Sequence, residues 1–274
     1  MIDIISPDDP VLDVYSKLTE AQLRNRLEPE KGIFICESPK VINTALDSGI
    51  EPLSLLAETD HIDSASKAVI ERVESMGVPV YRASNSILKE YSGYALTRGV
   101  LCAMRRPRTV SPEEICSKNG LIAILENVVD STNTGAIFRS AAALGADAVL
   151  LFPDCSDPLN RRSVRVSMGT VFQISWGYLP KADTAEQALS VLKTNGYKLF
   201  AMALDDNSLT LTDAVKRQTD RTALVFGAEG DGLKADTIAA CDYTVKIPMY
   251  HGVDSLNVAA AAALGIYTFR NSNK

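Results

Sequence analysis

The chain consists of two blocks in which short apolar runs alternate with amphipathic segments. In the first block, apolar runs predict strands at 33–37, 52–58, 78–83 and 99–104. Apolar residues spaced three and four positions apart predict helices at 14–28, 38–48, 64–76 and from residue 85 onward. Ser38 and Pro39 form a typical helix start, and Gly49 a typical helix end. The first block is therefore predicted to be a small α/β domain.

The second block repeats the alternation with more continuous apolar runs. These runs predict strands at 121–128, 148–152, 171–176, 197–204, 222–227 and 243–249. Helices are predicted at 134–144, 159–168, 184–195, 234–240 and from Ser255 onward. Such strands, separated by helices, indicate a parallel sheet that is covered on both faces. Because ligands of these sheets bind beyond the carboxyl ends of the strands, we expect the site in the loops that follow residues 128, 204, 227 and 247.

A polar segment at 105–114, with two prolines and a run of charges, separates the two blocks. We therefore predict a first domain at 1–107, a linker at 108–116 and a second domain at 117–274.

The charge of the chain limits how it could hold a nucleic acid. The net charge is −6, and neither half of the chain is basic. This opposes a surface that is covered with phosphate-binding side chains. Any nucleic acid must instead be held by local clusters, for which the candidates are Arg105-Arg106-Arg108 and Arg161-Arg162-Arg165.

Cysteine usage and hydropathy predict a cytoplasmic protein without metal or membrane segment. The five cysteines are scattered and lack C-x-x-C spacing, which favours reduced thiols over disulfides or a zinc site. The two histidines are too few and too far apart for a metal cluster. No apolar run approaches the ~20 residues that a membrane helix needs, and the first residues do not resemble a secretory signal.

The loop after the first strand of the second block reads ENVVDSTNTG, and AIFR follows it in the predicted helix. Asn133 or Thr134 is expected to cap this helix. Arg139, one turn inside and beside free N–H groups, would make a site for a phosphate or another anion. A capped helix with a solvent-facing arginine explains the same segment equally well.

Two later loops also carry unusual residues. Residues 226–233 read FGAEGDGL, with three glycines that allow the backbone to approach a ligand closely. The spacing G-x-x-G-x-G is neither the dinucleotide fingerprint nor a P-loop. Residues 247–258 read IPMYHGVDSLNV, and Ser255 is expected to cap the helix that follows. For Asn257, a plain hydrogen bond at the helix start is the simplest interpretation.

Taken together, in this order and spacing, the three loops closely resemble the three signature motifs of the SpoU (TrmH-like) RNA 2′-O-methyltransferases of the SPOUT superfamily. The resemblance covers about residues 121–270. It implies a parallel-sheet catalytic domain whose C-terminal segment is tucked through a loop as a trefoil knot, and a homodimer with the active site near the subunit interface. The first block resembles, less closely, a ribosomal-protein-like substrate-binding domain, with Glu37-Ser38 where Glu-Gly is usual.

The resemblance also assigns roles to residues of this chain. Its functional side chains correspond to Asn133, Arg139, Glu229, Ser255 and Asn257. Its cofactor, S-adenosylmethionine, would be held mainly by main-chain groups of Leu204 or its neighbours, Gly227, Ile247, Met249 and Leu256. This chain departs from the family by having Asp130-Ser131 where Asp-Pro is frequent, which loosens the loop without removing a reactive group.

The implied activity is methyl transfer to a ribose 2′-hydroxyl of ribosomal or transfer RNA. This reaction depends on positioning and on stabilising a developing alkoxide, and it needs no metal. A guanidinium has too high a pKa to be an ordinary base, so we expect Arg139 to bind phosphate and stabilise the oxyanion; its role as a base stays open. Asn133 and Asn257 would orient the ribose and the loops, and Glu229 would position Arg139 or its own loop.

Two other classes use the same kind of sheet. A nucleotide-cofactor oxidoreductase lacks support, because the fingerprint glycines and the acidic residue that follows them are missing. A non-catalytic RNA-binding or ribosome-associated protein would keep the fold, but the motif side chains are all present in this sequence. Transfer of a labelled methyl group to RNA distinguishes the three classes.

Overall fold

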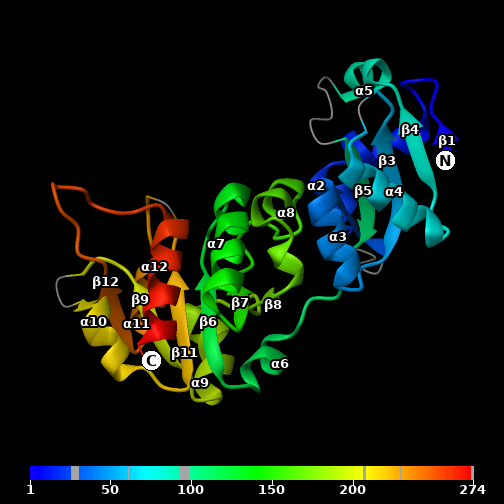
Figure 1. Cartoon of the computed structure of the whole chain (residues 1–274). Coiled ribbons are helices and arrows are strands. Elements are labelled where there is room, and N and C mark those ends of the chain that lie inside the picture. Colours follow the sequence, from blue (N-terminus) through cyan, green and yellow to red (C-terminus); the bar gives the residue numbers. More distant parts are fainter. Residues whose placement is uncertain (26–30, 61, 93–98, 206–207, 229, 273–274) are drawn as a thin grey trace. The chain divides into compact units, whose positions relative to one another are not determined.

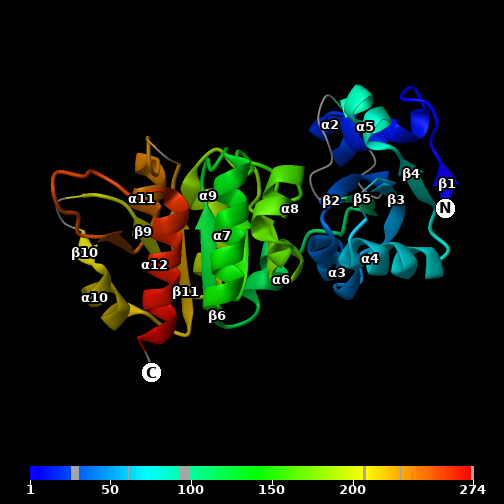
Figure 2. The ribbon, with the colours of Figure 1, turned by 45° about the horizontal axis from the view of Figure 1, so that its top comes forward.

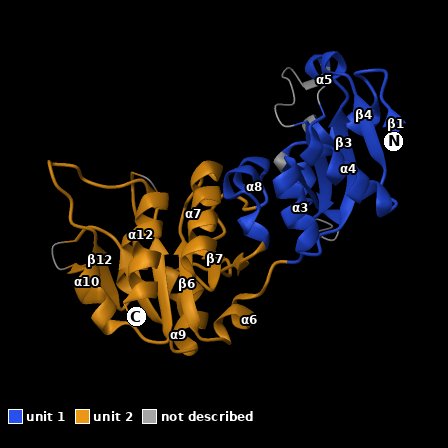
Figure 3. Cartoon of the chain, viewed as in Figure 1, with its two compact units in different colours: residues 1–108, 159–172 blue, residues 109–158, 173–274 orange. Residues whose placement is uncertain are grey.

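The computed structural model divides the chain into two compact units, and each is built on its own sheet (Figure 3). Unit 1 comprises Met1–Arg108 and Leu159–Phe172, and unit 2 comprises Thr109–Pro158 and Gln173–Lys274. The structure describes residues 1–272 apart from 26–30, 61, 93–98, 206–207 and 229. The predicted α/β class is confirmed.

Unit 1 has a mixed five-stranded sheet. Its strands are β1 (Ile2–Asp3), β2 (Ile33–Glu37), β3 (Pro52–Glu58), β4 (Val80–Ala83) and β5 (Val100–Arg105). Their order is β1-β4-β3-β5-β2, in which β5 runs antiparallel to both β2 and β3. Strands β2 to β5 therefore match the runs predicted for the first block to within two residues at each end, whereas the two-residue β1 was not predicted.

The helices of unit 1 cover this sheet. They are η1 (Pro10–Leu12), α1 (Asp13–Ser16), α2 (Glu20–Arg24), α3 (Pro39–Asp47), α4 (Ser64–Ser75), α5 (Asn85–Ser92), α8 (Arg161–Ser167) and η3 (Thr170–Phe172). The single helix predicted at 14–28 is wrong as far as the chain is described. Thr19 starts a new helix there, because it forms a capping box with Gln22.

Ser38 stands before α3 as predicted, but its side chain makes no capping hydrogen bond. Its φ of +88° lies in the region that glycine favours. Glycine adopts this conformation without strain, which gives a physical reason why Glu-Gly is usual where this chain has Glu37-Ser38.

The segment 159–172 belongs to unit 1, although it follows the predicted linker in the sequence. Arg161 donates from Nε to the buried carboxylate of Glu37 at 3.3 Å, and Arg165 lies 3.8 Å from the same carboxylate. Phe172 packs against Phe34 with ring centroids 5.5 Å apart. Two arginines of a proposed nucleic-acid cluster are thus engaged with a carboxylate of unit 1.

Unit 2 has a seven-stranded sheet in which all strands run parallel; a parallel sheet was predicted, but with six strands. Its strands are β6 (Gly120–Leu125), β7 (Ala148–Leu151), β8 (Ser175–Tyr178), β9 (Lys198–Met202), β10 (Leu209–Thr210), β11 (Arg221–Phe226) and β12 (Tyr243–Lys246). They lie in the order β10-β12-β9-β11-β6-β7-β8. This order makes neighbours of β9, β11, β12 and β6, the strands from which the predicted site loops leave.

One predicted strand of unit 2 is wrong. Residues 171–176 were expected to form it, but the chain forms η3 first and β8 begins only at Ser175. Met168 and Gly169 both have positive φ values and turn the chain after α8. The apolar residues Val171 and Phe172 therefore lie in the short helix η3 and not in a strand.

The helices of unit 2 pack on both faces of its sheet. They are α6 (Pro112–Cys116), α7 (Ser131–Leu144), α9 (Ala185–Thr194), α10 (Leu211–Ala214), η4 (Val215–Arg217), α11 (Ala235–Ala240) and α12 (Val258–Asn271). Helices α7 and α12 lie side by side on one face (Figures 1 and 2).

The pleat of β11 shows how each face is buried. Ala223 and Val225 join the core beneath α6, α9 and α11, whereas Leu224 and Phe226 lie against Gly265 of α12. The two-sided burial explains the continuous apolar runs in the sequence.

Candidate active site

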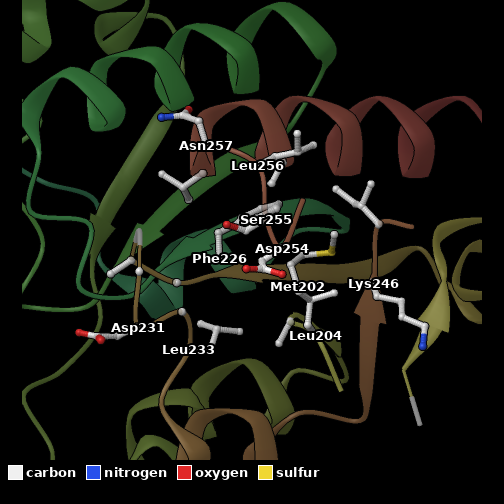
Figure 4. A pocket seen from close by; sticks show the side chains of 18 of the residues that line it. Met202, Leu204, Phe226, Asp231, Leu233, Lys246, Asp254, Ser255, Leu256 and Asn257 are labelled. Atoms are coloured by element: carbon white, nitrogen blue, oxygen red, sulfur yellow. The ribbon is translucent and has the colours of Figure 1, made fainter. Parts of the chain in front are cut away.

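A cavity of about 640 Å³ lies beyond the carboxyl ends of β9, β11 and β12 (Figure 4). The ends of these strands, the three loops that follow them, α11 and the start of α12 line it with Met202, Ala203, Leu204, Phe226, Gly227, Ala228, Gly230, Asp231, Gly232, Leu233, Ile238, Val245, Lys246, Ile247, Met249, Asp254, Ser255, Leu256, Asn257, Val258 and Ala261. Its place agrees with the rule for ligands of parallel sheets. Its size is in the range of small-molecule sites.

The five residues expected to hold a cofactor through their main chain all line this cavity. They are Leu204, Gly227, Ile247, Met249 and Leu256. They come together because β9 lies between β11 and β12 in the sheet. Contact of these residues with a cofactor stays a prediction.

The glycine-rich loop after β11 folds back on itself. Ala228 and Gly232 form an isolated bridge, in which the Gly232 N–H donates to the Ala228 carbonyl at 3.1 Å. A Cβ added to Gly227 would overlap the backbone of Gly232 and Leu233. Glycine at 227 is therefore needed for close approach of the two arms of the loop.

Two carboxylates of the cavity were not singled out from the sequence. Asp231 and Asp254 line it together with Lys246, and Figure 4 shows Asp254 between the other two in this view. The acidic character suits a cationic ligand group such as a sulfonium. Both residues stand in loops after parallel strands, and this position was the signal that could have identified them.

The starts of α7 and α12 are joined by a pair of asparagines. Asn257 accepts hydrogen bonds from the N–H groups of Ala259 and Ala260 at 2.9 and 3.4 Å. Its side-chain amide donates to Oδ1 of Asn133 at 3.0 Å, and Asn133 is buried. The structure thus brings together two predicted site residues that are 124 positions apart in the sequence.

Both predicted helix caps at this site are wrong. Asn257 caps α12 in place of Ser255, which lines the cavity two residues earlier. Asp130 caps α7 in place of Asn133 or Thr134, and its carboxylate accepts from the Thr132 N–H at 2.6 Å. Because Asp and Asn are about equally good caps, composition alone did not distinguish Asp130 from Asn133, and the helix starts three residues earlier than expected.

The early start of α7 changes the interpretation of Arg139. Arg139 lies eight residues after Ser131, which is about 12 Å along the helix axis and beyond the free N–H groups of the first turn. It is exposed, and it is not among the residues that line the cavity. It is also rotated by about 240° around the helix from Asn133. Arg139 therefore does not share an anion site with the free N–H groups at the helix start, and its contact with an RNA phosphate stays a prediction.

Glu229, the remaining predicted side chain, lies outside the described residues. Another acidic residue, Glu126 at the end of β6, is buried beside the same loop and was not predicted as functional.

Two groups beside the site, the Cys155 thiol and the Lys234 ammonium, have raised pKa values. Burial raises the pKa of the Cys155 thiol to about 12, and this thiol donates to the Leu125 carbonyl. The hydrogen bond from Lys234 to Asp154 raises the pKa of the Lys234 ammonium. Cys155 is therefore a poor nucleophile at neutral pH.

Within the described part of the chain, no group of three His, Cys, Asp or Glu side chains could hold a metal ion. None of the helices described is both long enough and apolar enough to cross a membrane.

Comparisons with known proteins agree with the motifs. The family model described as the SpoU rRNA Methylase family matches residues 120–267. An uncharacterized tRNA/rRNA methyltransferase of Mycobacterium bovis is 39% identical, over 97% of this chain and 90% of its own length. The 23S rRNA (guanosine-2′-O-)-methyltransferase RlmB of Escherichia coli is 30% identical, over 73% and 82%.

The fold is similar to that of a solved structure over nearly the whole chain. A crystal structure of an AdoMet-bound rRNA methyltransferase from Sinorhizobium meliloti superposes with a TM-score of 0.83, at 22% identity. The match covers 98% of this chain and 97% of the other.

Proposed function

The chain belongs to the SpoU rRNA methylase family, and on this premise we propose that it methylates a ribose 2′-hydroxyl of RNA with S-adenosylmethionine as methyl donor. The observation that carries the proposal is the single cavity that collects the predicted cofactor residues beside Ser255 and Asn257. No observation of the structure favours an oxidoreductase or a protein that only binds RNA.

The cavity suits S-adenosylmethionine in both size and chemistry. The loop backbones around Gly227 and Ile247 offer main-chain donors and acceptors, and Met202 and Leu204 offer apolar surface. Asp254 offers a carboxylate near any cationic group of the ligand. When bound, the cofactor supplies an electrophilic methyl group on a sulfonium.

The residues of this chain would act by positioning the ribose. Asn133 and Asn257 are fixed to each other and to the start of α12, so their amides hold a defined geometry next to the cavity. We propose that Ser255 and these amides orient the ribose and the loops. Arg139 would bind an RNA phosphate and stabilise the developing alkoxide, and Glu229 would position Arg139 or its own loop.

We propose that residues 1–107 select the RNA, that 108–116 form the linker and that 117–274 carry out the transfer. Arg105, Arg106 and Arg108 at the boundary would add phosphate contacts. The RNA is ribosomal or transfer RNA, and the reaction is cytoplasmic.

We further propose that the chain is a homodimer with a knotted catalytic domain. The strand order supports the knot. Strands β11 and β12 lie on either side of β9, which precedes both of them in the sequence, and the last helix, α12, packs on α7. The dimer is supported by Leu264 and Tyr267, large apolar residues one turn apart on α12 that remain exposed. Since Arg139 does not line the cavity of its own chain, we propose that the partner subunit supplies it.

Mixing two inactive variants tests this arrangement. Co-refolded Arg139→Ala and Asn257→Ala chains should regain about a quarter of wild-type activity if each site takes Arg139 from the partner, because random pairing makes half of the dimers mixed and each mixed dimer has one intact site. Complete absence of recovery, with dimers present by light scattering, would contradict the shared site.

The proposed activity is tested by incubating the protein with methyl-tritiated S-adenosylmethionine and total RNA. We expect acid-precipitable label in RNA with the wild-type protein and a loss of about 100-fold with Asn257→Ala. Binding of S-adenosylhomocysteine without any transfer to ribosomal or transfer RNA would instead support the non-catalytic alternative.

A further inference from the structure

A buried carboxylate at the end of β6 faces the start of α11. Glu126 is 1% exposed, and it follows the last residue of the strand. Its Oε2 accepts from the backbone N–H of Lys234 at 3.0 Å, and its Oε1 accepts from the Thr237 hydroxyl at 2.5 Å. Thr237 is itself fully buried. A buried carboxylate needs such donors, because an unsatisfied one costs several kcal/mol.

The same residue also holds the other end of the glycine-rich loop. The backbone N–H of Glu126 donates to the carbonyl of Phe226 at 2.9 Å. Phe226 is the last residue of β11, and Lys234 is the residue that precedes α11. Glu126 therefore contacts the residue before the loop 227–233 and the residue after it.

The side chain of Lys234 does not substitute for this contact. Lys234 occupies the N-cap position of α11, but its side chain makes no capping hydrogen bond. The Lys234 ammonium pairs instead with Asp154 at 3.2 Å, where both side chains are more than a third exposed. Such exposed pairs contribute little. The buried carboxylate is thus the stronger of the two attachments that fix Lys234.

We propose that Glu126 is a positioning residue that fixes the glycine-rich loop in the conformation that binds S-adenosylmethionine. This assignment rests on the proposed function. Gly227, Gly232 and Leu233 line the cavity, and their backbone groups can meet a ligand only if both ends of the loop stay in place. Glu126 does not line the cavity, so it acts through the loop.

Calorimetry with S-adenosylhomocysteine tests the assignment on the full-length protein. We expect Glu126→Ala to weaken binding about tenfold or more, the effect of losing one charge-assisted contact. Glu126→Gln should stay within about threefold of the wild type, because its amide can accept from Lys234 N–H and donate to Thr237. Thr237→Val removes the donor that fixes the second carboxylate oxygen and so loosens the Lys234 contact without removing it; its affinity should lie between the two.

Asp147→Ala is the control for loss of a carboxylate on a β6 backbone amide, although Asp147 is exposed and also pairs with Arg270 at 3.4 Å. Asp147 accepts from the backbone N–H of Leu121 at 2.8 Å, at the opposite end of β6 from the loop. Its replacement removes a carboxylate from a backbone amide of the same strand, so it should lower stability without changing S-adenosylhomocysteine affinity. Hydrogen exchange gives a second readout, in which the Lys234 amide should exchange faster in Glu126→Ala and Thr237→Val and stay slow in Asp147→Ala.

The outcomes separate this assignment from the proposed function. Failure of the wild-type protein to bind S-adenosylhomocysteine would overturn the proposed function and this role with it. Normal wild-type binding together with unchanged affinity in Glu126→Ala would overturn the role of Glu126 alone. Equal losses of S-adenosylhomocysteine affinity in Glu126→Ala and Asp147→Ala would also overturn the role of Glu126. So would a Glu126→Gln variant that binds as weakly as Glu126→Ala. If Glu126→Ala does not fold, unchanged binding and exchange in Thr237→Val would overturn the role.

Discussion

Replacing Gly227 by alanine should weaken cofactor binding by the glycine-rich loop while leaving the sheet intact. The added Cβ would lie closer than 3.0 Å to the carbonyl carbon and oxygen of Gly232 and to the nitrogen of Leu233, whereas ordinary contact begins at 3.4 Å. All three atoms belong to the backbone, so no side-chain rotation can relieve the overlap. The two arms of the loop must separate, against the Ala228–Gly232 hydrogen bond.

Overlap of this kind in a packed site costs about 1–3 kcal/mol of the free energy of unfolding. We expect calorimetry to show S-adenosylhomocysteine binding weakened by at least about tenfold, which corresponds to 1.4 kcal/mol. Gly265→Ala is the control, because its Cβ would meet Leu224 and Phe226 at 3.4–3.5 Å. As a helical substitution it should raise stability by up to about 1 kcal/mol. Normal binding by Gly227→Ala would refute the close-approach argument.

Three further predictions concern charge. Arg139→Lys and Arg139→Ala should each lower turnover by about 100-fold with little change in S-adenosylhomocysteine affinity, since lysine lacks the planar fork; full activity of the alanine variant would remove Arg139 from the mechanism. Neutralising Arg105, Arg106 and Arg108 together should weaken RNA binding and flatten its salt dependence, and an unchanged slope in filter binding would count against these contacts. Because the folded-state pKa of Cys155 is raised from 9.0 to about 12, its contribution to stability is complete below pH 9.0 and declines above it. Urea unfolding at about pH 8 and about pH 10 should therefore show lower stability at the higher pH, to which other groups with raised pKa values add; equal stability would contradict it.

The fold could be predicted from the sequence wherever apolar runs are continuous. The strands of unit 2 other than β8 and β10 were expected, because burial on both faces of a parallel sheet demands such runs. β10 has only two residues and carries no such signal. The association of 159–172 with unit 1 depends on Glu37 and Arg161, which are 124 residues apart, and no local pattern reports such a contact.

The sequence predicted which loops form the candidate site, but it predicted the contacts of their side chains less well. Leu204 and Ile247 could be placed beside Gly227 because the strands before them end at one edge of a sheet. The side-chain bond between Asn133 and Asn257 depends on the packing of α7 against α12, which the sequence does not specify. Glu126 was missed for a similar reason, since its donors come from the far side of the glycine-rich loop.

Identification of the RNA atom that accepts the methyl group tests the proposed 2′-O-methylation most directly. RNA labelled by the protein with tritiated S-adenosylmethionine is hydrolysed in alkali, which cleaves only where the ribose 2′-hydroxyl is free. Methylation of that hydroxyl predicts that the label remains in alkali-resistant dinucleotides. Label that is recovered in mononucleotides would place the methyl group on a base and would contradict the account.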